Sequence, residues 1–454
     1  MMLQVVQTNF RSFFTKGHER SLRAKKNIFQ SLLIKSGGVV CSFALIPLTI
    51  SYVGATNYGV WLTLSSIISW AALFDMGLGN GLKNKLAEDV ALGNFSEGQS
   101  HISSTYAMLT AISGALLVLF CFVNPYINWH GILNVPTNEL PNLNHLVAII
   151  FIFFCLQFIV QLINTVLTAN QKPALPALVN VLGQAVTIIS VVILTNFTAG
   201  SLTYLVYVVT GIPLIVLLFA SFYFYSGDYS SLSPTFKSVK YKYARQLLSA
   251  GGAFFIIQIG TLVLYETDNI VISQLFSPRE VTTFNIAYKL FSVVLMVFIM
   301  IITPLWSAFT EAYVKKDMDW IRLTLGKMNK LWLGLSLCTV MLLICSPVIY
   351  KLWLVDGVSV PFTLSLAMCI YTIALIWQAM YVQFLNGISK IRLQLYLSIF
   401  CALINIPLSI LLGKYWGLAG VTTSNTIIFI VMGIAFSVQT KKIINGTAAG
   451  LLAR

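Results

Sequence analysis

The chain has 454 residues, of which 57% are apolar and only 9% are charged, and its mean hydropathy is +0.84. A composition this apolar excludes a soluble globular protein. The net charge of +14 comes from basic connecting segments without interleaved aromatic residues. It therefore indicates contact with anionic lipid head groups rather than with nucleic acid.

Long apolar segments predict an all-α, polytopic membrane protein. A helix needs roughly 20 apolar residues to cross the hydrocarbon core, and about twelve segments meet that length. In chain order they are 28–52, 58–80, 100–124, 144–169, 174–196, 201–225, 246–275, 282–311, 324–350, 361–385, 391–413 and 417–439.

Basic residues gather in every second segment between these helices. They fill the stretch before residue 28, the connections after the second, fourth, sixth, eighth and tenth helices, and the stretch after the twelfth. Basic loops stay in the cytoplasm during insertion, so this pattern predicts that both termini lie inside.

The longest polar stretch between helices divides the chain almost in half. We expect a cytoplasmic tail at 1–27, a six-helix lobe at 28–226, a cytoplasmic linker at 227–245, a second six-helix lobe at 246–440 and a cytoplasmic tail at 441–454. Two six-helix bundles facing a central cavity suit a transporter that works by rocking.

The two predicted lobes share a weak internal repeat. A Leu-Leu pair precedes a Gly-Gly pair at 32–38 and again at 247–252, and a short polar turn ending in lysine joins the middle helices of each half. Each motif falls at the same helix, counted from the start of its half. The repeat is therefore parallel, with its axis along the membrane normal.

Two charged sites near the cytoplasmic ends of helices are candidates for substrate binding. Lys35 lies about 10 Å into the first helix, where its ammonium either returns to the interface as an anchor or makes a cationic contact with a substrate. Asp75, near the end of the second helix, is followed by alternating glycines and by Lys83 and Lys85. This segment is an ordinary helix end, a hinge whose backbone amides bind an anion together with the two lysines, or a gate in which Asp75 pairs with a basic residue.

Glu266 and Asp268 stand about two thirds along the seventh predicted helix, where a charge cannot easily reach either surface. Being two residues apart, they project about 200° from each other, so we expect only one to face a given cavity. Asp268 and Lys289 lie at similar depth on either side of Pro278, which predicts an ion pair. That pair is structural, or else Glu266 or Asp268 exchanges a proton or cation and couples transport to an ion gradient.

Several motifs spread over most of the chain resemble bacterial polysaccharide flippases. They are IPLTISYVG at 46–54, YGVW at 58–61, FDMGLGNGLKNKLAE at 74–88, DNIVIS at 268–273, AYKL at 287–290 and FLNGISK at 384–390. The family belongs to the multidrug/oligosaccharidyl-lipid/polysaccharide exporter superfamily, which also includes multidrug antiporters and the lipid II flippase.

The resemblance implies a two-lobed, MATE-like fold and a transporter rather than an enzyme. The implied substrate is an oligosaccharide unit linked to undecaprenyl diphosphate, carried across the bacterial inner membrane for O-antigen, capsule or exopolysaccharide assembly. The implied partners are this polyprenyl-diphosphate-linked oligosaccharide, membrane lipids and other polysaccharide-assembly proteins. No cofactor is expected apart from a proton or sodium gradient. The substrate-binding candidates are Lys35, Asp75, Lys83, Lys85 and Lys289, and the ion-coupling candidates are Glu266 and Asp268.

Two alternatives remain open. A multidrug cation antiporter of the same superfamily often uses acidic residues in its first helix, and residues 28–52 contain none. A polytopic polysaccharide polymerase or ligase is expected to carry a long outer loop with basic or histidine residues. The largest outer loop, at about 124–145, has Glu139 as its only Asp, Glu, Lys or Arg.

Overall fold

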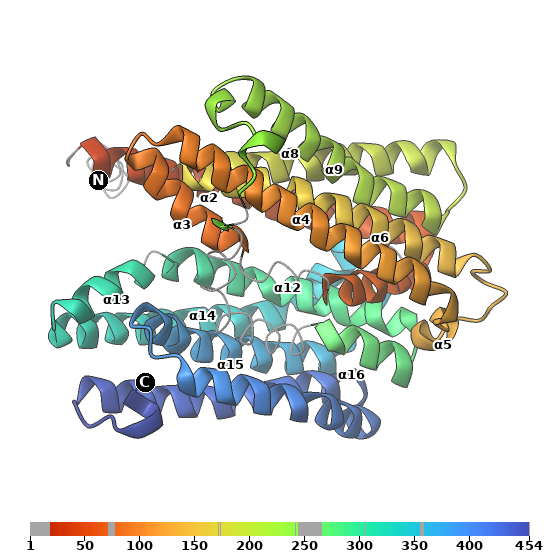
Figure 1. Ribbon diagram of the computed structural model, residues 1–454. Helices are drawn as coiled ribbons and strands as arrows, with labels where there is room; N and C mark the ends of the chain where they lie inside the picture. The colour runs from red at the N-terminus through yellow and green to blue at the C-terminus, as the bar shows by residue number, and fades with distance from the viewer. Residues whose placement is uncertain are drawn as a thin grey trace, which may run out of the picture. The chain divides into compact units, whose positions relative to one another are not determined.

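The computed structural model describes residues 19–70, 78–170, 172, 174–240, 242–243, 266–303, 305–354 and 358–453. Within these ranges every regular element is helical (Figure 1). The helices are α2 (Glu19–Ser69), α3 (Leu78–Ala91), α4 (Phe95–Val123), α5 (Trp129–Leu133), α6 (Leu143–Val160), α7 (Leu162–Ala169), α8 (Ala174–Phe197), α9 (Leu202–Ser226), an unlabelled helix at 266–275, α12 (Pro278–Ile302), α13 (Leu305–Val314), α14 (Met318–Trp353), α15 (Phe362–Gly387) and α16 (Arg392–Ile444).

Nine of the described helices are long and apolar enough to cross a membrane. Two of these nine contain a residue with non-helical backbone angles, Gly54 in α2 and Gly417 in α16. The seventh predicted segment is described only over 266–275. The all-α, polytopic architecture expected from hydropathy is therefore confirmed, whereas the orientation with both termini inside stays a prediction.

The helix α16 is two antiparallel segments that reverse at Gly417. The Asn405 amide donates to the Asn425 side-chain oxygen at 2.5 Å, and the Ser409 and Ser424 hydroxyls also lie 2.5 Å apart. Twenty residues of straight helix would span about 30 Å, so these contacts require a tight reversal. Gly417 has φ +62°, a conformation that glycine adopts without steric cost.

By their internal contacts, the residues form two compact units that do not follow chain order. Unit 1 comprises Met1–Tyr52, Phe74–Ile127 and Asn144–Gly252, and unit 2 comprises Val53–Leu73, Asn128–Leu143 and Ala253–Arg454. The second part of α2 and the short helix α5 thus belong with the C-terminal helices. The lobe boundaries at 28–226 and 246–440 remain a prediction from the sequence.

In unit 1, α3 packs through one face against α4 and α7. Its residues Leu78, Leu82 and Leu86 recur every four positions and are fully buried. They join Ile102 of α4 and Leu167 of α7 in one apolar cluster. The exposed side chains of Lys83 and Lys85 lie outside this buried leucine stripe, which is the amphipathic pattern of a helix that lies against a core.

In unit 2, α14, α15 and α16 run side by side (Figure 1). The second part of α2 joins them by a close backbone approach to the start of α12. A Cβ atom on Gly59 would lie 1.7 Å from the Pro278 carbonyl oxygen, and the Thr282 hydroxyl donates to the Ala55 carbonyl at 2.7 Å. Only glycine at position 59 leaves room for this packing.

The short helix α5 is bonded to the helix at 266–275. The Ser273 hydroxyl donates to the Leu133 carbonyl at 2.7 Å, and the Gln274 amide donates to the carbonyls of Gly131, at 2.6 Å, and Ile132. In return, the Asn134 amide donates to the Ser273 carbonyl at 3.0 Å. These bonds explain why residues 128–143 belong to unit 2.

Replacing Gly59 by alanine tests the packing of α2 on α12. The added methyl would overlap the Pro278 carbonyl, and overpacking of this kind costs about 1–3 kcal/mol. We expect Gly59→Ala to lower the thermal unfolding midpoint of the detergent-solubilised protein. Gly114→Ala is the matched control, since nothing lies within 4 Å of a Cβ there. Equal midpoints for the two variants would contradict the close approach.

Candidate functional site

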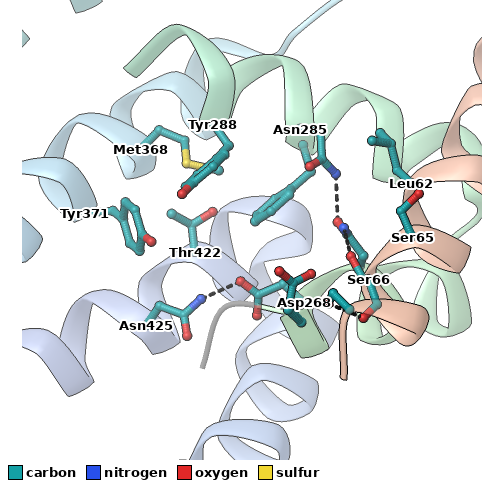
Figure 2. A pocket seen from close by; sticks show the side chains of 14 residues that line it. Leu62, Ser65, Ser66, Asp268, Asn285, Tyr288, Met368, Tyr371, Thr422 and Asn425 are labelled. Carbon is teal, nitrogen blue, oxygen red and sulfur yellow. Dashed lines mark hydrogen bonds between the residues drawn. The ribbon is translucent and has the colours of Figure 1, made fainter. Parts of the chain in front are cut away.

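A cavity of about 680 Å³ lies inside unit 2 (Figure 2). Five helices supply its walls: the second part of α2, the helix at 266–275, α12, α15 and the second part of α16. The described lining residues are Leu62, Ser65, Ser66, Ser69, Glu266, Asp268, Asn269, Phe284, Asn285, Tyr288, Met368, Tyr371, Thr422 and Asn425. Most of them carry a hydroxyl, amide or carboxyl group, so this membrane protein has a polar chamber within a helical bundle.

A chain of hydrogen bonds ends on Asp268. The Thr267 hydroxyl donates to the Asn405 side-chain oxygen at 3.2 Å, the Asn405 amide donates to Asn425, and the Asn425 amide donates to Asp268 Oδ2 at 2.6 Å. All four residues are buried. Each donor points toward the carboxylate, and hydrogen bonds aligned in this way polarise one another in a low dielectric. The network therefore favours a negative charge on Asp268.

A second chain of donors ends on Glu266. The Asn285 amide donates to Asn269 Oδ1, and the Asn269 amide donates to the Ser66 hydroxyl, both at 2.7 Å. The Glu266 carboxyl in turn interacts with the hydroxyls of Ser66 and Ser69. Figure 2 shows Ser66 and Asn285 on the side of the cavity away from Asn425. Each carboxylate thus has its own set of neutral donors.

The cavity combines two carboxylates with oxygen-rich neutral groups, and none of its described lining residues is Lys or Arg. Asp268 Oδ1 is buried and has no hydrogen-bond partner among the described residues, and the same holds for the Ser65 hydroxyl oxygen. A buried carboxylate oxygen without a donor is costly. The site is therefore chemically suited to a proton or a small hard cation, which oxygen ligands prefer, and unsuited to a phosphate.

Two expectations about the acidic pair need correction. Glu266 and Asp268 both line one cavity, although they were expected to face different surroundings. Glu266 interacts with Ser66 and Asp268 with Asn425, but Ser66 and Asn425 both line the same cavity. The expected Asp268–Lys289 ion pair is also wrong, because the partner of Asp268 within the described residues is Asn425.

The candidate lysines do not gather around this cavity. Lys289 is half-buried on α12 and is not among the described lining residues. Lys35, on α2, and Lys83 and Lys85, on α3, belong to unit 1 and have exposed side chains. Lys85 bonds Glu88 at 2.9 Å, and this hydrogen bond raises the pKa of Lys85. Asp75 lies outside the described residues.

Sequence reasoning missed the asparagines that organise the site. Asn285, Asn405 and Asn425 all fall within predicted spans, where a buried amide without a partner costs several kcal/mol. Their presence in apolar segments was a detectable signal, equal in kind to the acidic residues that were singled out. Their partners were not detectable, because pairing Asn405 with Asn425 depends on the reversal of α16.

The chain matches the model of a known family over more than half its length. The family is described as "Polysaccharide biosynthesis protein" and matches residues 24–309. The MatE family also matches, over residues 253–411. A Yersinia pseudotuberculosis protein whose name assigns it to O-antigen export is 22% identical over 374 residues, covering 78% of this chain and 81% of that protein. A Salmonella typhi protein named for O-antigen transport is 22% identical over 289 residues, covering 61% and 62%.

Solved structures of MATE transporters share the fold. An inward-facing multidrug resistance MATE transporter aligns with a TM-score of 0.71 at 14% identity, covering 92% of this chain and 95% of that one. A MATE transporter of Vibrio cholerae aligns with a TM-score of 0.66 at 13% identity, covering 95% and 99%. At these identities the likeness establishes the two-lobed transporter fold and no more.

Substitutions of Asp268 test the donor chain. In Asp268→Asn the side-chain oxygen still accepts from Asn425, whereas Asp268→Leu leaves that buried amide without an acceptor. Since an orphaned buried donor costs about 1–3 kcal/mol, we expect the leucine variant to be less stable by that amount in thermal or chemical unfolding. The same two changes at the exposed Asp319 are expected to differ by less than about 0.5 kcal/mol. Equal stability of the two Asp268 variants would contradict the network.

Proposed function

This chain belongs to the polysaccharide biosynthesis protein family, and we propose that it moves a polyprenyl-diphosphate-linked oligosaccharide across the membrane. The observation that carries the proposal is the family match over residues 24–309 together with relatives named for O-antigen export. The lipid chain remains in the bilayer while the sugar crosses through the protein. In this proposal the protein is a carrier and not an enzyme, it resides in the bacterial inner membrane, and both termini lie in the cytoplasm.

The proposal assigns two separate chemical tasks to separate residues. The exposed cations Lys35, Lys83 and Lys85 on α2 and α3 meet the diphosphate of the substrate, since a phosphate is best held by charge-assisted hydrogen bonds. Lys289 is proposed to share this task, and Asp75 is proposed to pair with a basic residue in a gate on the cytoplasmic side of the substrate path. Because these lysines do not line the acidic cavity, they do not neutralise its carboxylates.

The acidic cavity serves ion coupling in this proposal. Glu266 and Asp268 take up a proton or a sodium ion, whose charge compensates the buried carboxylates. Binding then stabilises one conformation of unit 2 relative to another by its difference in affinity. The donor chains through Asn425 and Ser66 hold the two carboxylates in place, and the open oxygen of Asp268 supplies the vacant bonding position that an ion needs.

Multidrug cation export is the second candidate function. The match of residues 253–411 to the MatE family favours it, and an acidic cavity also suits an organic cation. The family match over the larger part of the chain favours the oligosaccharide carrier.

Leaflet accessibility of a lipid-linked oligosaccharide in vesicles containing the purified protein tests the proposal. We expect transfer from the inner to the outer leaflet well above that of protein-free vesicles, measured by an enzyme or lectin added outside. Vesicles loaded with a fluorescent organic cation provide the second arm. Cation efflux without transfer of any lipid-linked sugar would overturn the proposal in favour of the antiporter.

The ion-coupling assignment is tested by the double variant Glu266→Gln, Asp268→Asn. We expect it to lose the acceleration of transfer by an imposed proton or sodium gradient, because neither amide can bind the ion as a counter-charge. Transfer down the substrate's own gradient should persist, which separates coupling from misfolding. Glu139→Gln in the outer loop is the matched control. Gradient-driven transfer retained by the double variant would refute the assignment.

The substrate contacts are tested by Lys35→Gln combined with Lys83→Gln. A charge-assisted hydrogen bond is worth about 1.5–3 kcal/mol, so we expect at least about a fivefold loss in the transfer rate at low substrate. Lys327→Gln with Lys330→Gln, two exposed lysines of α14, is the control of equal charge change. If both pairs lower the rate equally, the loss reflects net charge and the specific contact is rejected.

A further inference from the structure

In unit 1 the stretch at 230–243 is fixed along the first turns of α4. The Gln99 amide donates to the Ser233 carbonyl at 2.8 Å, the Thr235 amide donates to the Ser103 hydroxyl at 3.0 Å, and the Lys240 amide donates to the Ser104 hydroxyl at 2.9 Å. Three side chains from two turns of α4 therefore set the path of this segment, whose described residues (230–240 and 242–243) we call the strap.

The strap presents a bulky apolar side chain away from the protein. Phe236 is 99% exposed, and next to it Lys237 is exposed. Lys242 is also exposed, whereas the Lys240 ammonium lies 3.5 Å from Glu97 and over the Tyr243 ring. An aromatic ring flanked by lysines on a segment held in place is the pattern of a membrane-interface element, with the ring in the acyl region and the ammonium groups at head-group level.

A groove of about 540 Å³ runs between the strap and α4. Its lining is mainly apolar and includes Ala107 and Ala111 on α4 and Pro234, Phe236 and Val239 on the strap. The small alanines leave space that a larger residue would fill. Since no charged residue is among its described lining residues, the groove suits a hydrocarbon chain.

The floor of this groove continues along α4 as an exposed apolar stripe. Ala107, Ala111, Val118 and Phe122 share one face, because separations of four, eleven and fifteen residues return to nearly the same side of a helix. Val118 is 58% and Phe122 is 72% exposed. A chain that enters the groove can therefore follow α4 for about 22 Å along a surface suited to bilayer hydrocarbon.

We propose that the strap and α4 form a binding site for an anionic glycerophospholipid of the bilayer. Its phosphate contacts Lys237 and Lys242, and an acyl chain lies in the groove and along the α4 stripe. The positive charge of the strap complements the anionic head group, and Glu97 is already engaged by Lys240 and Tyr243. The site is independent of the acidic cavity, which lies in unit 2.

The exposure of this surface favours a bilayer phospholipid over the polyprenyl carrier lipid as its ligand. The stripe on α4 is exposed from Ala111 to Phe122, so in this proposal its ligand comes from the surrounding bilayer. Anionic phospholipids are abundant in the cytoplasmic leaflet, where basic segments gather. A ligand of this kind would secure the segment that joins the two halves of the chain.

Native mass spectrometry of the full-length protein tests this site. Phosphatidylglycerol and phosphatidylcholine with identical acyl chains are added to the detergent-solubilised protein. We expect retained phosphatidylglycerol to exceed phosphatidylcholine several-fold in the wild type. The double variant Phe236→Ala, Lys237→Gln should remove this preference, and Lys237→Gln, Lys242→Gln should remove it with the ring intact. Both variants change exposed side chains, and an unchanged thermal midpoint checks that they fold.

Phe222→Ala with Lys327→Gln is the matched control, since it also removes one exposed phenylalanine and one exposed lysine. It should keep the head-group preference. The proposal is overturned if the wild type shows no preference, if the strap variants keep it, or if the control loses it equally. It is also overturned if polyprenyl monophosphate displaces phosphatidylglycerol at equal concentration, because the carrier lipid would then be the ligand.

Discussion

The presence of a buried carboxylate, Asp268, and a half-buried one, Glu266, within a membrane-embedded bundle is the constraint on which the arrangement of unit 2 depends. A charge removed from water needs donors, and a helix cannot supply them from its own backbone. Among the described residues this need is met by neutral amides and hydroxyls of α2, α12 and α16, and none of the described lining residues is Lys or Arg. In the proposed ion coupling, this leaves Glu266 and Asp268 available to an ion that arrives and leaves, which a permanent salt bridge would prevent.

This solution depends on particular backbone geometry elsewhere. Asn405 and Asn425 can form one donor chain only because Gly417 reverses α16 between them. Likewise, Ser66 reaches Asn269 because the second part of α2 packs closely on α12 at Gly59. Two glycines far from the carboxylates in sequence thus determine which donors surround them. Loss of either close approach would disturb the site without changing any residue that lines it.

Much of the fold could be predicted from the sequence, because hydropathy acts locally. Segment lengths, the all-helical class and the acidic pair all follow from the cost of placing polar groups in lipid. The partner of Asp268 did not follow. The sequence places Lys289 at the same depth along its helix as Asp268. Depth does not determine the direction in which each side chain points around its helix, because that direction is set by packing. Asn425 lies 157 residues away in sequence, so its approach is a property of the bundle as a whole.

The division of the chain into its two units bears on how such a carrier can move. Residues 53–73 and 128–143 are bonded within unit 2 but are joined covalently to unit 1 at both ends. Any rigid-body displacement between the units must be absorbed at these junctions, because an intact helix resists bending. The first junction adjoins Gly54, whose φ of +80° interrupts α2, and the third adjoins Ile127, which is extended after a short 3₁₀ turn. The fourth coincides with Leu143, where α6 begins.

At the described junctions, the chain therefore passes from one unit to the other at a point where a helix is interrupted, has ended or begins. The hydrogen bonds of residues 131–134 with residues 273–276 hold the segment 128–143 to unit 2. The geometry of the connections is therefore compatible with alternating access without unwinding any of the long helices.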